Sequence, residues 1–314
     1  MSRAADAMIR SPQSKMRTCC SGFLLLGATL AILGAARPSS AQDPLPRTAW
    51  GAPDLRGLWN HGTATPLERP ERHAGQDQLT DNEIAAVNAE ARSTEGVGAR
   101  RAVWWERSLS DGRTSMITSP AGGRIPYTVD ARRRVRALPP PAVDTPEDRG
   151  PQERCISYGI PRLGGPYSQN VYLAQTPDHV LLLFEMVHEF RVIPLDGRPR
   201  LAAGVGQWLG DSRGRWDGDT LVIETTNFSA HQLFRRLPMA AARLVERLTR
   251  IDADTLHYDV TFEDPSIWTE PWTAAIEMAR TEGPMFEFAC HEGNVGMTAI
   301  LEIGRTEELK QEER

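Results

Sequence analysis

Residues 255–264, TLHYDVTFED, decide the fold class, because apolar and polar side chains alternate along them. One side of the extended chain carries the apolar residues Leu256, Tyr258, Val260 and Phe262. The other side carries the polar residues His257, Asp259, Thr261 and Glu263. A period of two residues is that of a β-strand with one face buried. This stretch therefore predicts a strand at the edge of an apolar core.

Comparable segments lie on both sides of this strand. Apolar or alternating runs predict further strands over 179–186, 187–193, 219–228, 243–251, 272–281 and 285–290. Short turns such as Asp196-Gly197 and Gly283-Pro284 separate them, and no helical stretch intervenes, which argues against a parallel α/β sheet. We therefore expect a mainly β protein in which residues 169–304 form an antiparallel meander that closes into a lipocalin-like barrel. Residues 305–314 are expected to be a charged tail.

The part of the chain before the predicted barrel has a different composition. Residues 42–168 are rich in Pro and Gly, and the density of prolines over 109–168 forbids long regular elements. A helix is expected over 77–108, because Thr80 and Glu83 stand at the spacing of a capping box. We expect this region to wrap the barrel.

The first 41 residues have the order of a secretory signal peptide. A basic start precedes the apolar run 23–33, and small residues follow up to Ala41. The apolar run is shorter than the roughly 20 residues of a membrane-spanning helix, although an uncleaved anchor remains the alternative. We expect a periplasmic or extracellular bacterial protein with no membrane attachment after cleavage. Removing the leader changes the net charge from −5 to −9, which disfavours nucleic acid as a partner.

Cleavage of the leader would leave two cysteines, Cys155 and Cys290. In an oxidising compartment an isolated pair is expected to form a disulfide. That bond would join the Pro-rich region to the pentapeptide CHEGN at 290–294.

Two motifs resemble those of an uncharacterised family of secreted bacterial proteins. They are WLGDSRGRWDGDTLVIETTNF at 208–228 and CHEGN at 290–294, and the likeness covers most of the mature chain. The resemblance supports export and supplies no catalytic residues.

His188 is the leading candidate for chemistry. On a strand over 187–193 it would share the inward face with Phe190 and Val192, and an imidazole there can carry a proton near neutral pH. The alternative is a core histidine bonded to a backbone carbonyl. Candidate partners are Glu185, His291 and Glu292, and candidate anion holders are Arg191 and Arg213.

Other groups have both structural and functional interpretations. Asp211 and Arg213 belong to an acidic and basic loop that could bind calcium, but the alternation favours Asp–Arg pairs. Zinc held by His188, His291 and a carboxylate is chemically possible, yet no ligand spacing supports it. We therefore predict no cofactor. The tryptophans Trp59, Trp104 and Trp268 could stack on a ligand or pack in the core.

The predicted barrel and its candidate residues are compatible with two functions. The first is an exported, cofactor-independent acid/base enzyme, such as a lyase, isomerase or hydrolase, acting on a small apolar or aromatic molecule in the barrel. The second is a non-catalytic barrel that binds an apolar small molecule. The expected partner in both cases is a small molecule, and the sequence gives no oligomeric state. The side chains that line the barrel interior distinguish the two.

Overall fold

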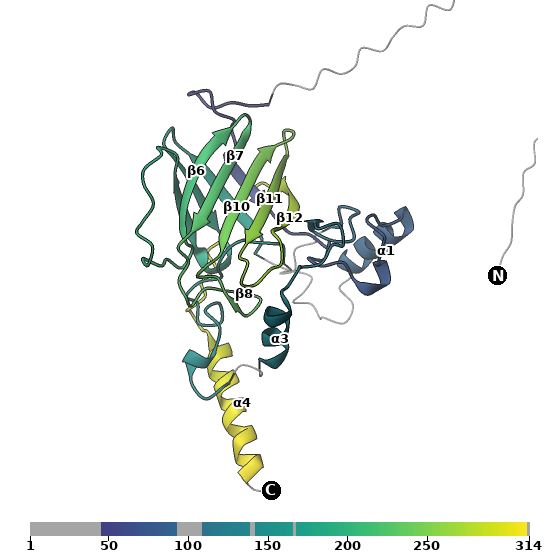
Figure 1. The fold of residues 1–314 in the computed structure, drawn as a ribbon, viewed down its shortest axis with the longest axis vertical. Coiled ribbons are helices and arrows are strands. Elements are labelled where there is room, and N and C mark those ends of the chain that lie inside the picture. Colours follow the sequence, from purple (N-terminus) through teal and green to yellow (C-terminus); the bar gives the residue numbers. More distant parts are fainter. Residues whose placement is uncertain (1–44, 93–108, 139–141, 166–167, 313–314) are drawn as a thin grey trace, which may run out of the picture. The chain divides into compact units, whose positions relative to one another are not determined.

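A computed structural model describes residues 45–92, 109–138, 142–165 and 168–312. The fold is mainly β, as predicted, and its sheet forms a nearly closed antiparallel barrel with a seam (Figure 1). The strands are β1 (Gly57–Asn60), β2 (Ile117–Ser119), β3 (Asn170–Gln175), β4 (His179–Phe184), β5 (Phe190–Pro194), β6 (Asp211–Asp217), β7 (Thr220–Thr226), β8 (Leu233–Phe234), β9 (Leu237–Pro238), β10 (Arg243–Arg250), β11 (Thr255–Glu263) and β12 (Trp272–Arg280). The helices are α1 (Asp81–Arg92), α3 (Val129–Ala137) and α4 (Val295–Glu312), with short 3-10 turns at Glu71–His73, Pro146–Asp148 and Met186–His188.

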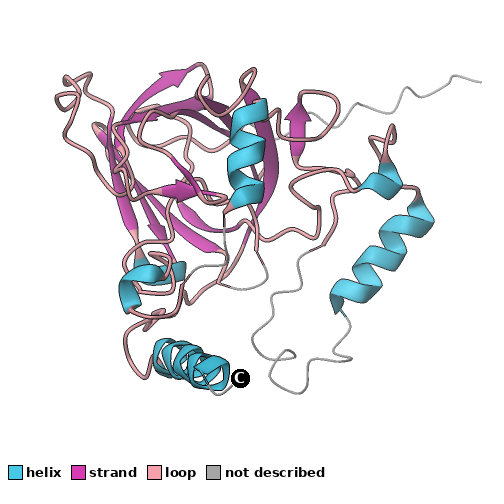
Figure 2. Cartoon of the chain, turned by 60° about the horizontal axis from the view of Figure 1, so that its bottom comes forward, coloured by secondary structure: helices cyan, strands magenta, loops and turns pink. Residues whose placement is uncertain are grey.

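The described strands of the barrel follow the order β5-β4-β3-β1-β12-β11-β10-β7-β6, and β2 adds to β12. The alternation at 255–264 becomes β11, whose buried positions are the predicted apolar ones. Its inward side chains meet those of β10 and β12 in the core, and Figure 2 shows the strands curving around this common interior. The pattern that predicted the strand therefore also placed its buried face correctly.

The seam of the barrel lies between β5 and β6. Each neighbouring pair in the nine-strand path is antiparallel, so the first and last strands of this odd-numbered path run in the same direction. Parallel neighbours need a crossover connection, and residues 195–210 supply it. Arg213 holds this connection by donating to the carbonyl oxygens of Arg198 and Pro199.

Gly214 on β6 permits the close approach at the seam. A Cβ at this position would lie 2.6 Å from Leu195 Cδ2 and 3.0 Å from Ile193 Cγ2. We expect Gly214→Ala to lower the free energy of unfolding by about 1–3 kcal/mol, the usual range for overpacking. Urea unfolding measures this change. Gly122→Ala is the matched control, because its Cβ would meet nothing within 4 Å, and an unchanged midpoint for Gly214→Ala would contradict the close seam.

The region before the barrel does more than wrap it. Its residues supply β1, which completes the sheet between β3 and β12, and β2, which pairs with β12. The predicted helix is present as α1, and its capping box is confirmed: Thr80 N donates to Glu83 Oε2 at 2.8 Å, and Glu83 N donates to Thr80 Oγ1 at 3.4 Å. The remainder of the range predicted to hold this helix, 93–108, lies outside the described residues, as does the leader 1–41.

The strand predicted at 285–290 is wrong, because those residues adopt no regular structure. Strand β12 already pairs with β11 on one side and with β1 and β2 on the other, so it offers no free edge to a following strand. The chain instead forms α4, which runs across the expected boundary at residue 304. The loop expected around Asp211 is also wrong, since Asp211 begins β6.

Candidate functional site

The inward side of β5 is the reverse of the one predicted. Val187 and His188 adopt left-handed backbone angles, with φ of 60° and 53°, in a turn that delays the strand to Phe190. In the register that follows, the buried Leu182 pairs with Arg191. A shift of one residue exchanges the two faces of a strand. Phe190 is therefore 64% exposed and Arg191 only 4% exposed.

Arg191 is the centre of a polar cluster inside the barrel, formed by Arg191, Ser212, Thr225, Glu246 and Tyr258. Arg191 donates to both carboxylate oxygens of Glu246, at 2.9 and 2.7 Å, and to Ser212 Oγ and Thr225 Oγ1. The Tyr258 hydroxyl donates to Glu246 Oε1 at 2.9 Å. These bonds run from β5 past β6 and β7 to β10 and β11, so the cluster joins the two sides of the seam.

Burial and pairing together fix the protonation states in this cluster. Burial lowers the pKa of Arg191, but the Glu246 carboxylate outweighs it and the pKa lies above its ordinary value. Burial, and then the neighbouring carboxylate, raise the pKa of Tyr258 well above its ordinary value. Tyr258 therefore stays a hydrogen-bond donor at physiological pH.

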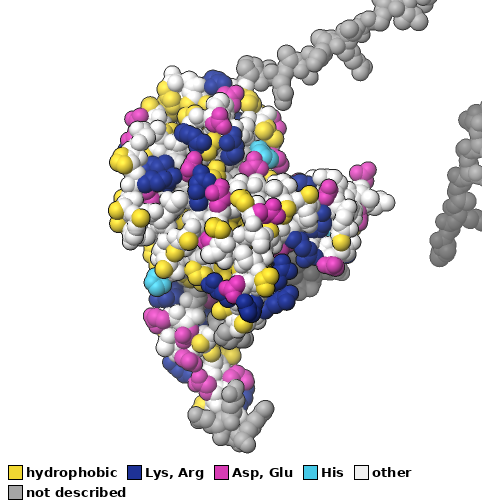
Figure 3. All heavy atoms as spheres, in the orientation of Figure 1, with side chains coloured by type: hydrophobic (Ala, Val, Ile, Leu, Met, Phe, Trp, Pro, Cys, Tyr) yellow, Lys and Arg dark blue, Asp and Glu magenta, His cyan; other side chains and the backbone are white. Residues whose placement is uncertain are grey.

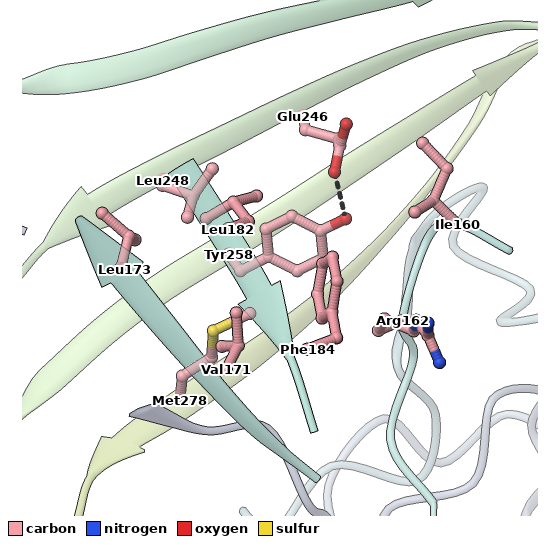
Figure 4. Close-up of a pocket in the computed structure, with 10 residues that line it drawn as sticks. All are labelled: Ile160, Arg162, Val171, Leu173, Leu182, Phe184, Glu246, Leu248, Tyr258 and Met278. Carbon is pink, nitrogen blue, oxygen red and sulfur yellow. Dashed lines mark hydrogen bonds between the residues drawn. The ribbon is translucent and has the colours of Figure 1, made fainter. Parts of the chain in front are cut away.

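A small cavity adjoins the cluster (Figure 4). Its volume is about 20 Å³, which is room for about one water molecule. Apolar side chains form most of its wall: Ile160, Val171, Leu173, Leu182, Phe184, Leu248 and Met278. Glu246, Tyr258 and Arg162 supply the polar part. The cavity is thus an apolar space with ionisable groups on its wall.

Residues 155–165, which we call the cover segment, close one side of this cavity. Ile160 and Arg162 come from this segment, and both are buried. Figure 4 shows the two side chains reaching the cavity from a loop. The segment is held by the Cys155–Cys290 disulfide, which confirms the predicted pair. Glu189 adds a second attachment by accepting from Tyr158 N at 2.9 Å and from Arg162 Nη2 at 2.6 Å.

Arg162 and His61 leave buried polar atoms without partners among the described residues. The atoms are Arg162 Nε, Arg162 Nη1 and His61 Nδ1. Burial lowers the pKa of Arg162 to about 10, with partial compensation by Glu189, so the side chain stays charged. Burial and the charge of Arg162 lower the pKa of His61 to about 3, so the imidazole is neutral.

The predicted catalytic residues do not converge. The prediction that His188 points inward is wrong, since it is exposed in the turn before β5. Glu185 is half-buried and accepts from the backbone and side-chain nitrogens of Asn170. His291 and Glu292 are exposed beside the disulfide. Of the predicted residues, Arg191 alone belongs to the interior cluster.

The remaining predicted residues have packing partners within the protein. Asp211 accepts from Leu201 N and pairs with Arg213, which agrees with the expected Asp–Arg pairing. Trp59 is fully buried, and the guanidinium carbons of Arg250 and Arg280 lie 5.5 and 5.7 Å from its ring centre. The buried Trp268 packs edge-on against neighbouring aromatic rings in the core. Trp104 lies outside the described residues.

Sequence reasoning missed Glu246, Tyr258 and Arg162 as parts of a site. A signal was present for Glu246, because it falls between Leu244 and Leu248 on the inward face of β10. A charged residue in phase with apolar ones predicts a buried charge that needs a partner. No comparable pattern marks Arg162, which lies in an irregular segment.

The outer face of the barrel carries interspersed charges of both signs (Figure 3). On β11, His257 lies between two carboxylates, with Nδ1 2.6 Å from Glu277 Oε1 and Nε2 3.0 Å from Asp259 Oδ2. The hydrogen bond to Asp259 is the largest cause that raises the pKa of His257, to about 9.

The raised pKa of His257 predicts a pH dependence of stability. The ordinary pKa is about 6.5, so the stabilisation is complete below pH 6.5 and is lost as the pH rises through about 9. We expect a loss of about 1 kcal/mol or less for a solvent-accessible pair. Urea unfolding at pH 6 and pH 9.5 measures it. His257→Gln should remove this part of the pH dependence, and an equal dependence in that variant would contradict the assignment.

Comparisons with known proteins found no matching family model, no similar curated protein and no similar solved structure. Within the described ranges, no helix is long and apolar enough to cross a membrane. The same residues contain no group of three His, Cys, Asp or Glu side chains that could hold a metal ion.

Proposed function

We propose that this protein binds a small apolar molecule inside its barrel, beneath the cover segment. One observation carries the proposal: a small, mostly apolar cavity borders a buried polar cluster, and a loop lines one side of it. Ligand sites in barrels combine an apolar wall with a few placed polar groups. Because the cavity has room for only about one water molecule, binding requires the cover segment to move outward. This motion is part of the proposal.

The acid/base enzyme is the second candidate, and the Tyr258–Glu246 contact supports it. A phenol and a carboxylate bordering the cavity could exchange a proton with a bound molecule. Both carboxylate oxygens of Glu246 already accept hydrogen bonds from Arg191, so this carboxylate is less available to take a proton from a bound molecule. Because of this ion pair between Arg191 and Glu246, we favour binding over catalysis. Tyr258→Phe would separate the candidates, since an enzyme would lose turnover whereas a binding protein would keep its affinity for hydrocarbons.

The proposed setting is the periplasm or the exterior of a bacterial cell. The order of charge and apolar residues in the leader supports export, as does the resemblance of residues 208–228 and 290–294 to motifs of secreted bacterial proteins. The Cys155–Cys290 disulfide is compatible with such an oxidising compartment.

Methylcyclohexane is a suitable first probe, because it is small and has no polar group. We expect it to shift the NMR signal of the Met278 methyl group, which lines the cavity. The methyl group of Met239, which is buried outside the cavity-lining set, should not shift. Met278→Ala should enlarge the cavity and strengthen binding, whereas Met239→Ala should only destabilise the protein. An unshifted Met278 methyl signal in the wild type at a saturating concentration of the probe would contradict binding inside the barrel.

A further inference from the structure

The buried guanidinium of Arg162 has hydrogen-bonding capacity that the described residues do not use. Its side chain is only 4% exposed and donates through Nη2 to Glu189. Nε and Nη1, with three N–H groups between them, have no partner in the described part of the chain. Leaving buried donors unpaired is costly, and more so when they are charged. A molecule with an acceptor atom would satisfy them.

Arg162 is also held in a defined position at the cavity. Its guanidinium carbon lies 4.5 Å from the ring centre of Tyr158 and 4.9 Å from that of Phe184. Phe184 itself lines the cavity, and Figure 4 shows Arg162 at its edge beside this ring. The aromatic contacts and the ion pair to Glu189 limit the motion of the guanidinium. An acceptor on a molecule in the cavity would therefore meet a largely preorganised donor.

The charges around the cavity decide which kind of acceptor fits. Arg162 pairs with Glu189, and Arg191 pairs with Glu246. The two positive and two negative charges of these pairs balance, and the four side chains are between 2% and 11% exposed. An ionised carboxylate on a ligand would bring an unbalanced negative charge into this environment, which is strongly unfavourable. A neutral acceptor adds no such charge.

We propose that the ligand is a neutral apolar molecule carrying one carbonyl oxygen, as in a ketone, aldehyde or ester, which accepts a hydrogen bond from Arg162. This inference rests on the proposed function and names the ligand class for the same cavity. The hydrocarbon part contacts the apolar wall formed by Leu173, Leu182 and Met278. The carbonyl lies at the Arg162 edge, because Nη1 carries two N–H groups that have no partner among the residues that the structure describes.

The test compares three probes of similar size: methylcyclohexane, cyclohexanone and cyclohexanecarboxylate. Affinities are measured at pH 7 through the Met278 methyl signal. Arg162→Met retains a long side chain but removes the donors, so the ratio of cyclohexanone to methylcyclohexane affinity should fall by about tenfold or more. The two probes differ in hydration, but this difference cancels when the affinity ratio of the wild type is compared with that of Arg162→Met. In the wild type, cyclohexanone should bind more tightly than the carboxylate.

Glu189→Gln tests the charge argument separately. It keeps the Arg162 donors but leaves the cavity with an extra positive charge, so the carboxylate should gain affinity relative to cyclohexanone. If Arg162→Met fails to fold, the double variant Arg162→Met/Glu189→Gln is used in its place, because it removes both charges of the ion pair.

The outcomes separate the two proposals. No binding of any probe overturns the proposed function. Binding of methylcyclohexane with an unchanged ratio in Arg162→Met preserves that function and overturns the carbonyl inference, because a bound water would then satisfy Arg162. Tighter wild-type binding of the carboxylate than of cyclohexanone overturns the inference as well.

Discussion

Glu246→Leu is expected to lower the free energy of unfolding by about 3–5 kcal/mol, because it leaves a buried charge without its partner. The Arg191 and Glu246 side chains are each only 2% exposed, and Arg191 donates to both carboxylate oxygens. The substitution also removes the acceptor of the Tyr258 hydroxyl. Urea unfolding at neutral pH, with the midpoint and slope both fitted, measures the loss.

Two further variants show whether the cost comes from the unpaired charge. The double variant Arg191→Met/Glu246→Leu should recover much of the stability, since an apolar replacement of a whole buried pair is often neutral or stabilising. Asp217→Ala is the surface control. It removes a partner of Arg247 in an exposed pair and should cost about 1 kcal/mol or less. Equal losses for Glu246→Leu and Asp217→Ala would refute a buried role for Glu246.

The strands of the barrel could be predicted where one face is apolar along the whole segment. In β11 the alternation gave both the strand and its buried face, because no charged residue interrupts the inward side. In β5 the same reasoning failed, since two apolar side chains, Phe190 and Val192, lie outside and the charged Arg191 lies inside. The phase of β5 is set by its pairing with β4 and by the turn at 186–188, which are tertiary features.

The candidate site was harder to predict because its parts come from distant segments. Arg191 and Glu246 are separated by 55 residues and meet only when the sheet curves into a barrel. Arg162 comes from an irregular segment. Of its neighbours in space, His61 precedes it in the sequence by about 100 residues and Glu189 follows it. Periodicity describes one element at a time, so it cannot show which elements meet across a barrel interior. The disulfide was predictable because removal of the leader with Cys19 and Cys20 leaves only two cysteines to pair.

Removal of the disulfide is the second change with a large expected effect. Cys155 and Cys290 close a loop with a sequence separation of 135 residues. In the chain-entropy model a loop of this length stabilises the folded state by about 4–5 kcal/mol. We expect Cys155→Ser/Cys290→Ser to lose a stability of this order in urea unfolding. Dithiothreitol should reproduce the loss in the wild type and have no effect on the variant.

The disulfide also has a local consequence, because Cys155 begins the cover segment. Without the bond, Glu189 remains as an attachment through Tyr158 and Arg162. The cover segment should then open more often, so methylcyclohexane should bind and dissociate faster in the double serine variant at a temperature where it is still folded. Adding Glu189→Gln should increase both rates further. Two free thiols in the unreduced protein would contradict the pairing, and unchanged rates in the folded variant would show that the disulfide does not control access to the cavity.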